Sequence, residues 1–257
     1  MQKILLLIIT MIIGLFASTT VLKGQDFSNK NSAETKIFNL DSFNAVKSSQ
    51  AIEVEIVKAE QDKVVATSNY ISELNIEVKN KTLYVNYKPN VSLQNADTKV
   101  IVYMRNLVKA EAENASNIRV KSVFNTTNQT FETRTAGKIF ADSKSENVYI
   151  NLRNAGEFSG KIDAKNLNVN ISSASIAKLS GSADKAEISA DSASNLDARN
   201  VNIKTAKVYA TATSTIILSI SEELTAEATS LAKIKYKTLS GIKFSAIRKS
   251  GGKIDSI

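Results

Sequence analysis

The chain has 257 residues and a formal net charge of +8, and it contains no cysteine, histidine or tryptophan. Without cysteine it has no disulfide, catalytic thiol, thiolate metal site or lipid-carrying cysteine. Without histidine it lacks the commonest general base and metal ligand, so we expect no cofactor and no metal. Its basic residues are scattered among acidic ones, which favours a solvated mixed-charge surface over nucleic-acid binding.

Residues 1–25 have the pattern of a secretory signal peptide. A short basic start precedes an apolar run from Ile4 to Phe16, which a polar stretch follows. This run is too short for a spanning helix, although an uncleaved anchor is the alternative. The cleavage site falls between residues 19 and 25. No later segment approaches 18 continuous apolar residues, so no transmembrane segment is expected in the mature chain. The expected location is the periplasm, the outer surface or the extracellular space.

After the signal peptide we expect a flexible leader over 26–35 and a single domain over 36–257. Its first part, 36–105, shows the period-two alternation of half-buried strands. Four runs carry it: 52–56, 74–78, 83–87 and 100–104. Asn80-Lys81 connects the second run to the third, which predicts a hairpin.

A repeat of about 19 residues occupies the second part, 106–257. Clusters of small residues recur there, and each has one anchor residue. The anchors are Ser116, Gly137, Gly156, Ser175, Ser194, Ser214 and Ser230. A period in this range is typical of stacked supersecondary units. Within each unit apolar residues alternate with polar ones, as in Leu167, Val169 and Ile171.

These nested periods predict an all-β fold, a β-solenoid of 19–21-residue coils that follows an N-terminal strand and hairpin region. Each coil is a strand, a tight corner of small residues and a second strand. One coil cannot bury its apolar face alone, so the neighbouring coils complete the core. A helix is the alternative over 109–113 and 222–227, but the β-branched, Ser and Thr content favours strands.

When the coils are aligned on their anchors, equivalent residues of successive coils form columns, and two of these columns contain polar or charged residues. The column two before the anchor contains Asn114, Asn154 and Ser173, and the alternation predicts that it is inward and that stacked partners satisfy its polar groups. The column three before the anchor is predicted to face outward. It contains the candidate ligand-facing residues Arg134, Arg153 and Asp191, together with Ser172, Thr211, Glu111 and Glu227.

Polysaccharide-cleaving sites on some β-helices combine carboxylates with Arg or Lys on one outer face. Asp191 and Arg153 are two coils apart, which is about 10 Å at the expected spacing. Other candidates for such a site are Asp163, Asp184, Asp197 and Arg199. A mixed solvated face is the simpler interpretation of all of them. The polar segment 124–130, where one spacing lengthens to 21, is a candidate exposed interaction loop.

The run from Ala164 to Ser175 resembles the repeated strand and corner of the putative autotransporter adhesin head GIN domain family, also called DUF2807. The segment from Glu223 to Tyr236 resembles its closing unit, and the pattern over 43–87 also matches. The resemblance covers roughly 37–236. It implies a β-helix-like fold and an adhesin role, and it supplies no catalytic residues. The chain differs from the family by using Asn-Ala-Ser, Ser-Ala-Ser and Ala-Thr-Ser where glycine-rich corners are usual.

Together these patterns predict an exported, non-enzymatic adhesin-like binding or scaffold protein. A cell-surface glycan or an envelope component is the expected partner. The alternative is a polysaccharide lyase or hydrolase with an Asp/Arg site on the solenoid face. The sequence determines neither the ligand nor the oligomeric state.

Overall fold

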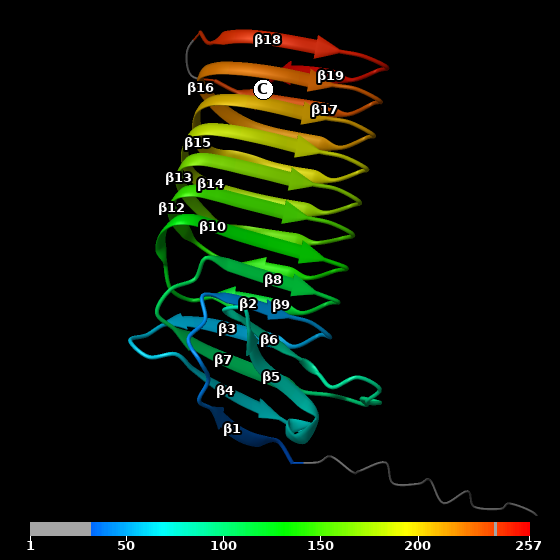
Figure 1. Cartoon of the computed structure of the whole chain (residues 1–257). Helices are drawn as coiled ribbons and strands as arrows, with labels where there is room; N and C mark the ends of the chain where they lie inside the picture. The colour runs from blue at the N-terminus through cyan, green and yellow to red at the C-terminus, as the bar shows by residue number, and fades with distance from the viewer. Residues whose placement is uncertain (1–31, 239–240) are drawn as a thin grey trace, which may run out of the picture. The chain divides into compact units, whose positions relative to one another are not determined.

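The computed structural model describes residues 32–238 and 241–257, which form an all-β solenoid with an N-terminal strand region (Figure 1). The predicted signal peptide and residues 26–31 of the predicted leader lie outside the described residues. The first strand, β1 (Glu34–Phe38), pairs with β4 from Glu34 onward, so the last two residues of the expected leader belong to a strand.

The N-terminal region contains seven strands and one short 3₁₀ helix. They are β1, β2 (Ala45–Ser48), β3 (Glu53–Lys58), β4 (Lys63–Ser68), η1 (Ile71–Glu73), β5 (Leu74–Lys79), β6 (Thr82–Tyr87) and β7 (Thr98–Met104). The predicted hairpin is present as the antiparallel pair β5–β6. Asn80 and Lys81 have φ of 50° and 61°, as a two-residue hairpin turn requires.

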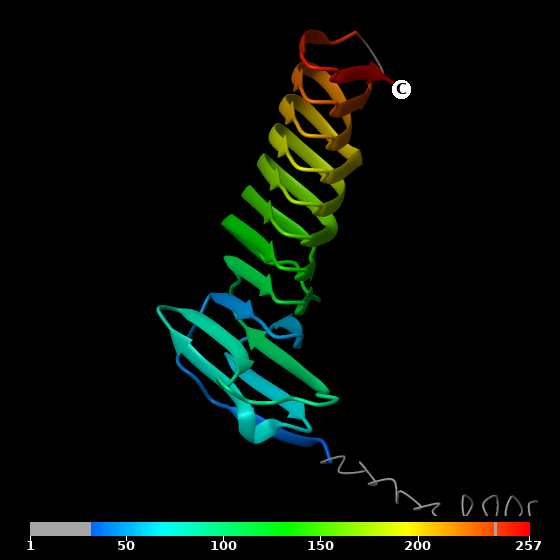
Figure 2. The same cartoon turned by 90° about the vertical axis from the view of Figure 1, so that its right-hand side faces the viewer.

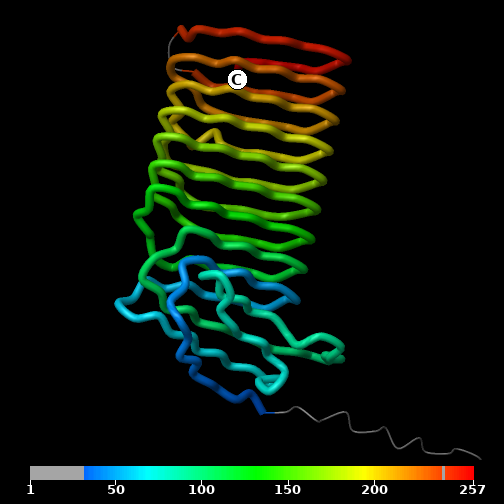
Figure 3. The backbone as a smooth tube through the Cα atoms, in the orientation of Figure 1, coloured from blue at the N-terminus to red at the C-terminus, as the bar shows by residue number. Residues whose placement is uncertain are grey.

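The coils contain the remaining twelve strands. They are β8 (Lys109–Glu113), β9 (Asn117–Val120), β10 (Asn125–Arg134), β11 (Lys138–Phe140), β12 (Ser143–Leu152), β13 (Glu157–Ile171), β14 (Ile176–Ala190), β15 (Asn195–Ala210), β16 (Thr215–Ala228), β17 (Lys233–Lys237), β18 (Lys243–Arg248) and β19 (Lys253–Ser256). The predicted helix alternative is wrong, because both of its segments lie in β8 and β16. Figure 3 shows the coils stacked one upon another.

The described strands form one continuous hydrogen-bonded sheet, whose two faces, joined through the long strands β13 to β16, enclose the core and are called sheet 1 and sheet 2. Sheet 1 contains, in order, β5, β6, β2, β8, β10, β12, the second halves of β13 to β16, and β18. Sheet 2 contains β1, β4, β7, β3, β9, β11, the first halves of β13 to β16, β17 and β19. The coil strands pair in parallel with their equivalents in the next coil.

A tight corner joins each sheet 1 strand to the following sheet 2 strand, and Figure 2 looks onto these corners. Two consecutive residues have positive φ there, for example Ser173 at 56° and Ala174 at 59°. This is the geometry of a type I′ turn. Non-glycine residues adopt it at a cost of about 1–2 kcal/mol each. Hydrogen bonds between successive corners offset that cost: Ala155 N–H donates to Ser173 O (2.8 Å), and Ala174 N–H donates to Ser192 O (2.9 Å).

From Ser116 to Ser214, the residue after each turn is the predicted anchor, and it is buried. Ser175 Oγ donates to Ser172 O (2.6 Å), and Ser194 Oγ donates to Asp191 O (2.7 Å), so each hydroxyl bonds the backbone of its own turn. The column two before the anchor was predicted to be inward, and this is wrong. Its residues from Asn114 to Ser192 are exposed, because they occupy the first left-handed position of the turn.

The core changes in character along the stack. The first coils bury large side chains, and the rings of Phe131 and Phe158 lie 5.1 Å apart. From β14 onward, alanines share the core with Leu, Ile and Val. The buried alanines of β14 are Ala177, Ala183, Ala186 and Ala190.

The structure corrects two further predictions, one in the last coils and one in the first. Lys233 of β17 pairs with Thr215, so Ala232 and not Ser230 is equivalent to the anchor Ser214. The segment 124–130 was predicted to be a loop, but its residues from Asn125 onward belong to β10. Phe124 and Gln129 are buried, whereas Asn125, Thr127 and Asn128 are exposed. Phe124 fills the core, and Gln129 Nε2 donates to the Leu107 carbonyl (3.1 Å).

Candidate functional site

A shallow groove of about 750 Å³ lies on the outer face of sheet 1, over β12 to β16. The alternation of each strand explains it. Leu167 and Val169 of β13 point into the core, so Asn166 and Asn168 point out.

Parallel, in-register pairing arranges the groove's outward residues in two columns. One column contains Asn147, Asn166, Lys185, Thr205 and Glu223. The other contains Tyr149, Asn168, Glu187, Lys207 and Thr225. Five strands at about 4.8 Å spacing make the groove roughly 19 Å long, with its long axis across the strands.

A ladder of asparagines leads into the groove. Asn147 Nδ2 donates to Asn128 Oδ1 (2.9 Å), and Asn166 Nδ2 donates to Asn147 Oδ1 (2.8 Å). Each amide therefore holds the next one in a set orientation. Such ladders form when identical side chains stack in register on neighbouring strands.

Several polar groups of the groove have no protein partner. Among residues 32–238 and 241–257, Lys185, Glu187 and Lys207 form no ion pair and no side-chain hydrogen bond, and neither does the hydroxyl of Tyr149. The Tyr149 side chain is 41% exposed. Donors, acceptors and an aromatic surface are thus available to a molecule that lies in the groove.

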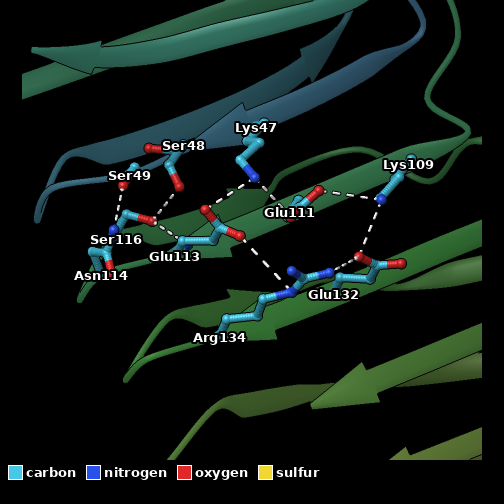
Figure 4. A network of polar contacts seen from close by, with 10 residues as sticks. All are labelled: Lys47, Ser48, Ser49, Lys109, Glu111, Glu113, Asn114, Ser116, Glu132 and Arg134. Carbon is cyan, nitrogen blue, oxygen red and sulfur yellow. Dashed lines mark hydrogen bonds and ion pairs between the residues drawn. The ribbon is translucent and has the colours of Figure 1, made fainter. Parts of the chain in front are cut away.

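A network of three cations and three carboxylates lies beside the groove on the same sheet, on β2, β8 and β10 (Figure 4). Lys47 Nζ is 2.9 Å from Glu111 and 2.9 Å from Glu113, and Lys109 Nζ is 3.1 Å from both Glu111 and Glu132. Arg134 contacts Glu132 (3.5 Å) and Glu113 (3.8 Å). The six charges cancel, and they tie the N-terminal strand β2 to the first two coils.

Glu111 is the most buried member of this network. Burial opposes its ionisation, but the hydrogen bond from Lys47 and the charge of Lys109 outweigh burial and lower the pKa of Glu111 to about 2. Burial also opposes the charge on Lys47, yet hydrogen bonds to Glu111 and Glu113 raise the pKa of Lys47. Because its charges are paired with one another, the network has a structural role: it is a joint that connects the N-terminal region to the first coils.

The predicted ligand-facing residues lie one column or more outside the groove. Arg134 takes part in the ionic network. The register places Arg153, Ser172 and Asp191 in one outward column at the tight corner, as predicted. Glu111 belongs to a different column from Asp191, because Glu111 pairs with Glu132 and Glu113 pairs with Arg134. The ligand-facing role of Arg134, Arg153 and Asp191 stays a prediction.

The other acidic candidates do not join that column. Asp163 accepts a hydrogen bond from Ser182 (3.1 Å), Asp184 pairs with Lys204 (2.7 Å) and Asp197 pairs with Arg199 (2.8 Å). All three lie near the second corner, at the far end of the sheet 1 strands from the tight corner. For Asp163 this separation is roughly 30 Å, nine residues along an extended strand. The structure therefore does not assemble the predicted Asp/Arg set.

The sequence contains a pattern that predicts the groove, but it lies in the middle of the strands, whereas the predicted site residues were chosen near the tight corner. Asn166, Asn168 and Asn170 alternate with apolar residues, and Asn147, Tyr149 and Asn151 precede them by one 19-residue period. Aligned by the 19-residue period, these residues form adjacent outward columns, and this pattern predicts a polar strip on one outer face.

No helix among the described residues has the length and apolar character needed to cross a membrane. Within the same ranges, no three acidic side chains are grouped closely enough to hold a metal ion.

Comparison with known proteins adds a family and a set of similar folds. The model of the family described as "Putative auto-transporter adhesin, head GIN domain" (DUF2807) matches residues 42–238. No curated protein matches the chain.

Several crystal structures are similar. A putative adhesin from Parabacteroides merdae has a TM-score of 0.80 at 16% identity, over 88% of this chain and 96% of that one. A putative adhesin from Parabacteroides distasonis has a TM-score of 0.82 at 15% identity, over 88% and 98%. A putative lipid binding protein from P. distasonis has a TM-score of 0.76 at 15% identity, over 88% and 97%. At these identities the likeness shows the fold alone.

Proposed function

Since the chain belongs to the putative autotransporter adhesin head GIN domain family, we propose that it is an exported, adhesin-like protein that binds a cell-envelope glycan in the sheet 1 groove. The groove carries this proposal. Amides, charged groups and a tyrosine ring share this elongated hollow.

The chemistry of the groove favours a sugar over a lipid or a protein. An acyl chain needs an apolar cavity, whereas the outward side chains here are Asn, Thr, Lys, Glu and Tyr. Protein interfaces have an apolar core depleted of charge. Sugar hydroxyls both donate and accept hydrogen bonds, so they can pair with the unpartnered ammonium and carboxylate groups of Lys185, Glu187 and Lys207. The chain has no tryptophan, and Tyr149 supplies the flat surface on which a sugar ring can stack.

In this proposal the protein acts by binding and not by catalysis, and it meets its ligand outside the cytoplasm. The predicted signal peptide supports export. Protease treatment of intact cells, followed by immunoblotting of cell fractions, tests the location. Protection of the chain in the cytoplasmic fraction would contradict it.

Binding is tested with the purified mature protein on a panel of envelope polysaccharides, by retention and by calorimetry. We expect Tyr149→Ala to reduce retention at least tenfold. Tyr209→Ala is the matched control, because Tyr209 is 42% exposed on the same face but outside the groove. Equal losses for the two variants, or no retention by the wild type, would refute the proposal.

A further inference from the structure

A second hollow of about 460 Å³ lies on the N-terminal region. It is lined by outward residues of β5, β6 and β2 and by the first tight corners. Its polar lining resembles that of the groove, and it also includes a tyrosine, Tyr84. Asn75 Nδ2 donates to Glu77 Oε1 (3.0 Å) and to Asn86 Oδ1 (3.3 Å), so the amides of this hollow are held in place.

The strand register places this hollow and the groove on one continuous face. Tyr84 of β6 pairs with Lys47 of β2, and Lys47 pairs with Glu111 of β8. Glu111 pairs with Glu132 of β10, which pairs with Asn151 of β12, the first strand of the groove. Because residues in register point to the same side of a sheet, both hollows open on the outer face of sheet 1. The N-terminal hollow extends to Lys47 of β2 and Glu113 of β8, so β10 is the strand that lies between it and the groove.

The ionic network leads from the N-terminal hollow, which Lys47 and Glu113 line, towards the groove. Its charges satisfy one another, so a molecule that crosses it meets no net charge. The groove also carries both signs of charge, Lys185 and Lys207 beside Glu187 and Glu223, and Glu223 pairs with Lys243 (3.1 Å). A polyanion or a polycation would meet like charges as well as opposite ones along the path. A neutral chain avoids that repulsion.

From this continuity we propose that the ligand is one extended, neutral polysaccharide chain that lies across the strands of sheet 1 and occupies the groove and the N-terminal hollow together. Tyr149 and Tyr84 each stack on a sugar ring, one in each hollow. From β6 to β16 the path crosses eight strand spacings, about 38 Å. An extended pyranose advances by about one such spacing, so roughly eight sugars fill the path.

This inference rests on the proposed function, and it adds a dependence on chain length. A chain that reaches both hollows binds the second one intramolecularly, which raises affinity without any new contact. A chain of four sugars fits within the groove and gains nothing from Tyr84.

The test measures the affinity of the mature protein for neutral gluco-, manno- and xylo-oligosaccharides of two to twelve sugars, with polygalacturonate as an acidic comparison. We expect chains of eight sugars or more to bind at least tenfold more tightly than tetrasaccharides. Tyr84→Ala should remove that advantage and leave tetrasaccharide binding unchanged, whereas Tyr149→Ala should weaken both. Tyr84→Phe should retain the advantage, and Tyr209→Ala is the control.

Three results would overturn the inference and leave the proposed function standing. They are affinity independent of length, long-chain affinity unaffected by Tyr84→Ala in a folded variant, and tighter binding of polygalacturonate than of every neutral chain. If no sugar binds at all, the proposed function falls together with the inference.

Discussion

The N-terminal strands and the coils bury their interiors in different ways. In the N-terminal region, antiparallel pairs mix with parallel ones, and the core contains branched side chains such as Val54, Ile56 and Val102, which are fully buried. The coils from β14 onward bury many alanines beside Leu, Ile and Val, and backbone hydrogen bonds between their equivalent turns repeat from coil to coil. Regular backbone pairing therefore accommodates more small side chains in the core than the mixed pairing of the N-terminal region does.

The aromatic pair of the first coils gives the largest test of this difference. Phe131 is fully buried against Phe158, so Phe131→Ala should lower the free energy of unfolding by about 3–5 kcal/mol. Urea unfolding followed by circular dichroism measures the change. Phe244→Ala is the control, because Phe244 is 40% exposed on the last coil and should cost under about 1 kcal/mol. Similar losses would show that the early coils do not depend on their large core.

The second corner of the coils gives the next test. Gly181 has a φ of +113°, and a Cβ there would collide with the carbonyl oxygen of Ile162 in the neighbouring coil. Gly181→Ala should therefore destabilise the fold by at least about 1–3 kcal/mol, the usual cost of a strained backbone conformation. Thermal unfolding checks this. Gly241→Ala should have little effect, since open space surrounds Gly241.

The ionic network joins the two regions and gives a smaller, pH-dependent effect. The folded pKa of Glu111 is about 2, below its ordinary value of 4.5. Its contribution to stability is therefore present above pH 4.5 and is lost as the pH falls towards 2. Glu111→Gln should cost about 2 kcal/mol at pH 7.

Urea unfolding of this variant and the wild type between pH 2 and pH 7 measures the difference. The difference in the free energy of unfolding between the two proteins should shrink as the pH falls below 4.5. Glu146→Gln, which breaks the exposed pair with Lys165, should cost under about 0.5 kcal/mol at every pH. If Glu111→Gln destabilises the protein equally at every pH, the charge of Glu111 does not stabilise the contact between β2 and the first coils.

The open end of the stack gives the smallest effect on stability. Arg248 of β18 pairs with the buried Ala228, so it occupies an inward position, and its Nη2 donates to the Ile254 carbonyl (2.8 Å). Inward charges protect sheet edges from pairing with other chains. Arg248→Val should change the free energy of unfolding by under about 1 kcal/mol. Sedimentation velocity should show new self-association, whereas the exposed Lys253→Val should not. A monomeric Arg248→Val would show that this arginine does not guard the end.

The sequence by itself determined the strands, the hairpin and the coil period. Alternation with period two reports which side of a strand is buried, and a 19-residue period reports stacking. It also predicted the family, which the match over residues 42–238 confirms.

Only the tertiary structure decided what the corners and faces do. Simple alternation continues through a corner, whereas two left-handed residues break it, so Asn114 and Ser173 face solvent and the last anchor moves to Ala232. The groove depends on residues such as Tyr149, Asn168 and Glu187, which are 19 positions apart in succession and become neighbours through coil register. Parallel pairing between coils sets that register, and no local pattern in a single coil contains it.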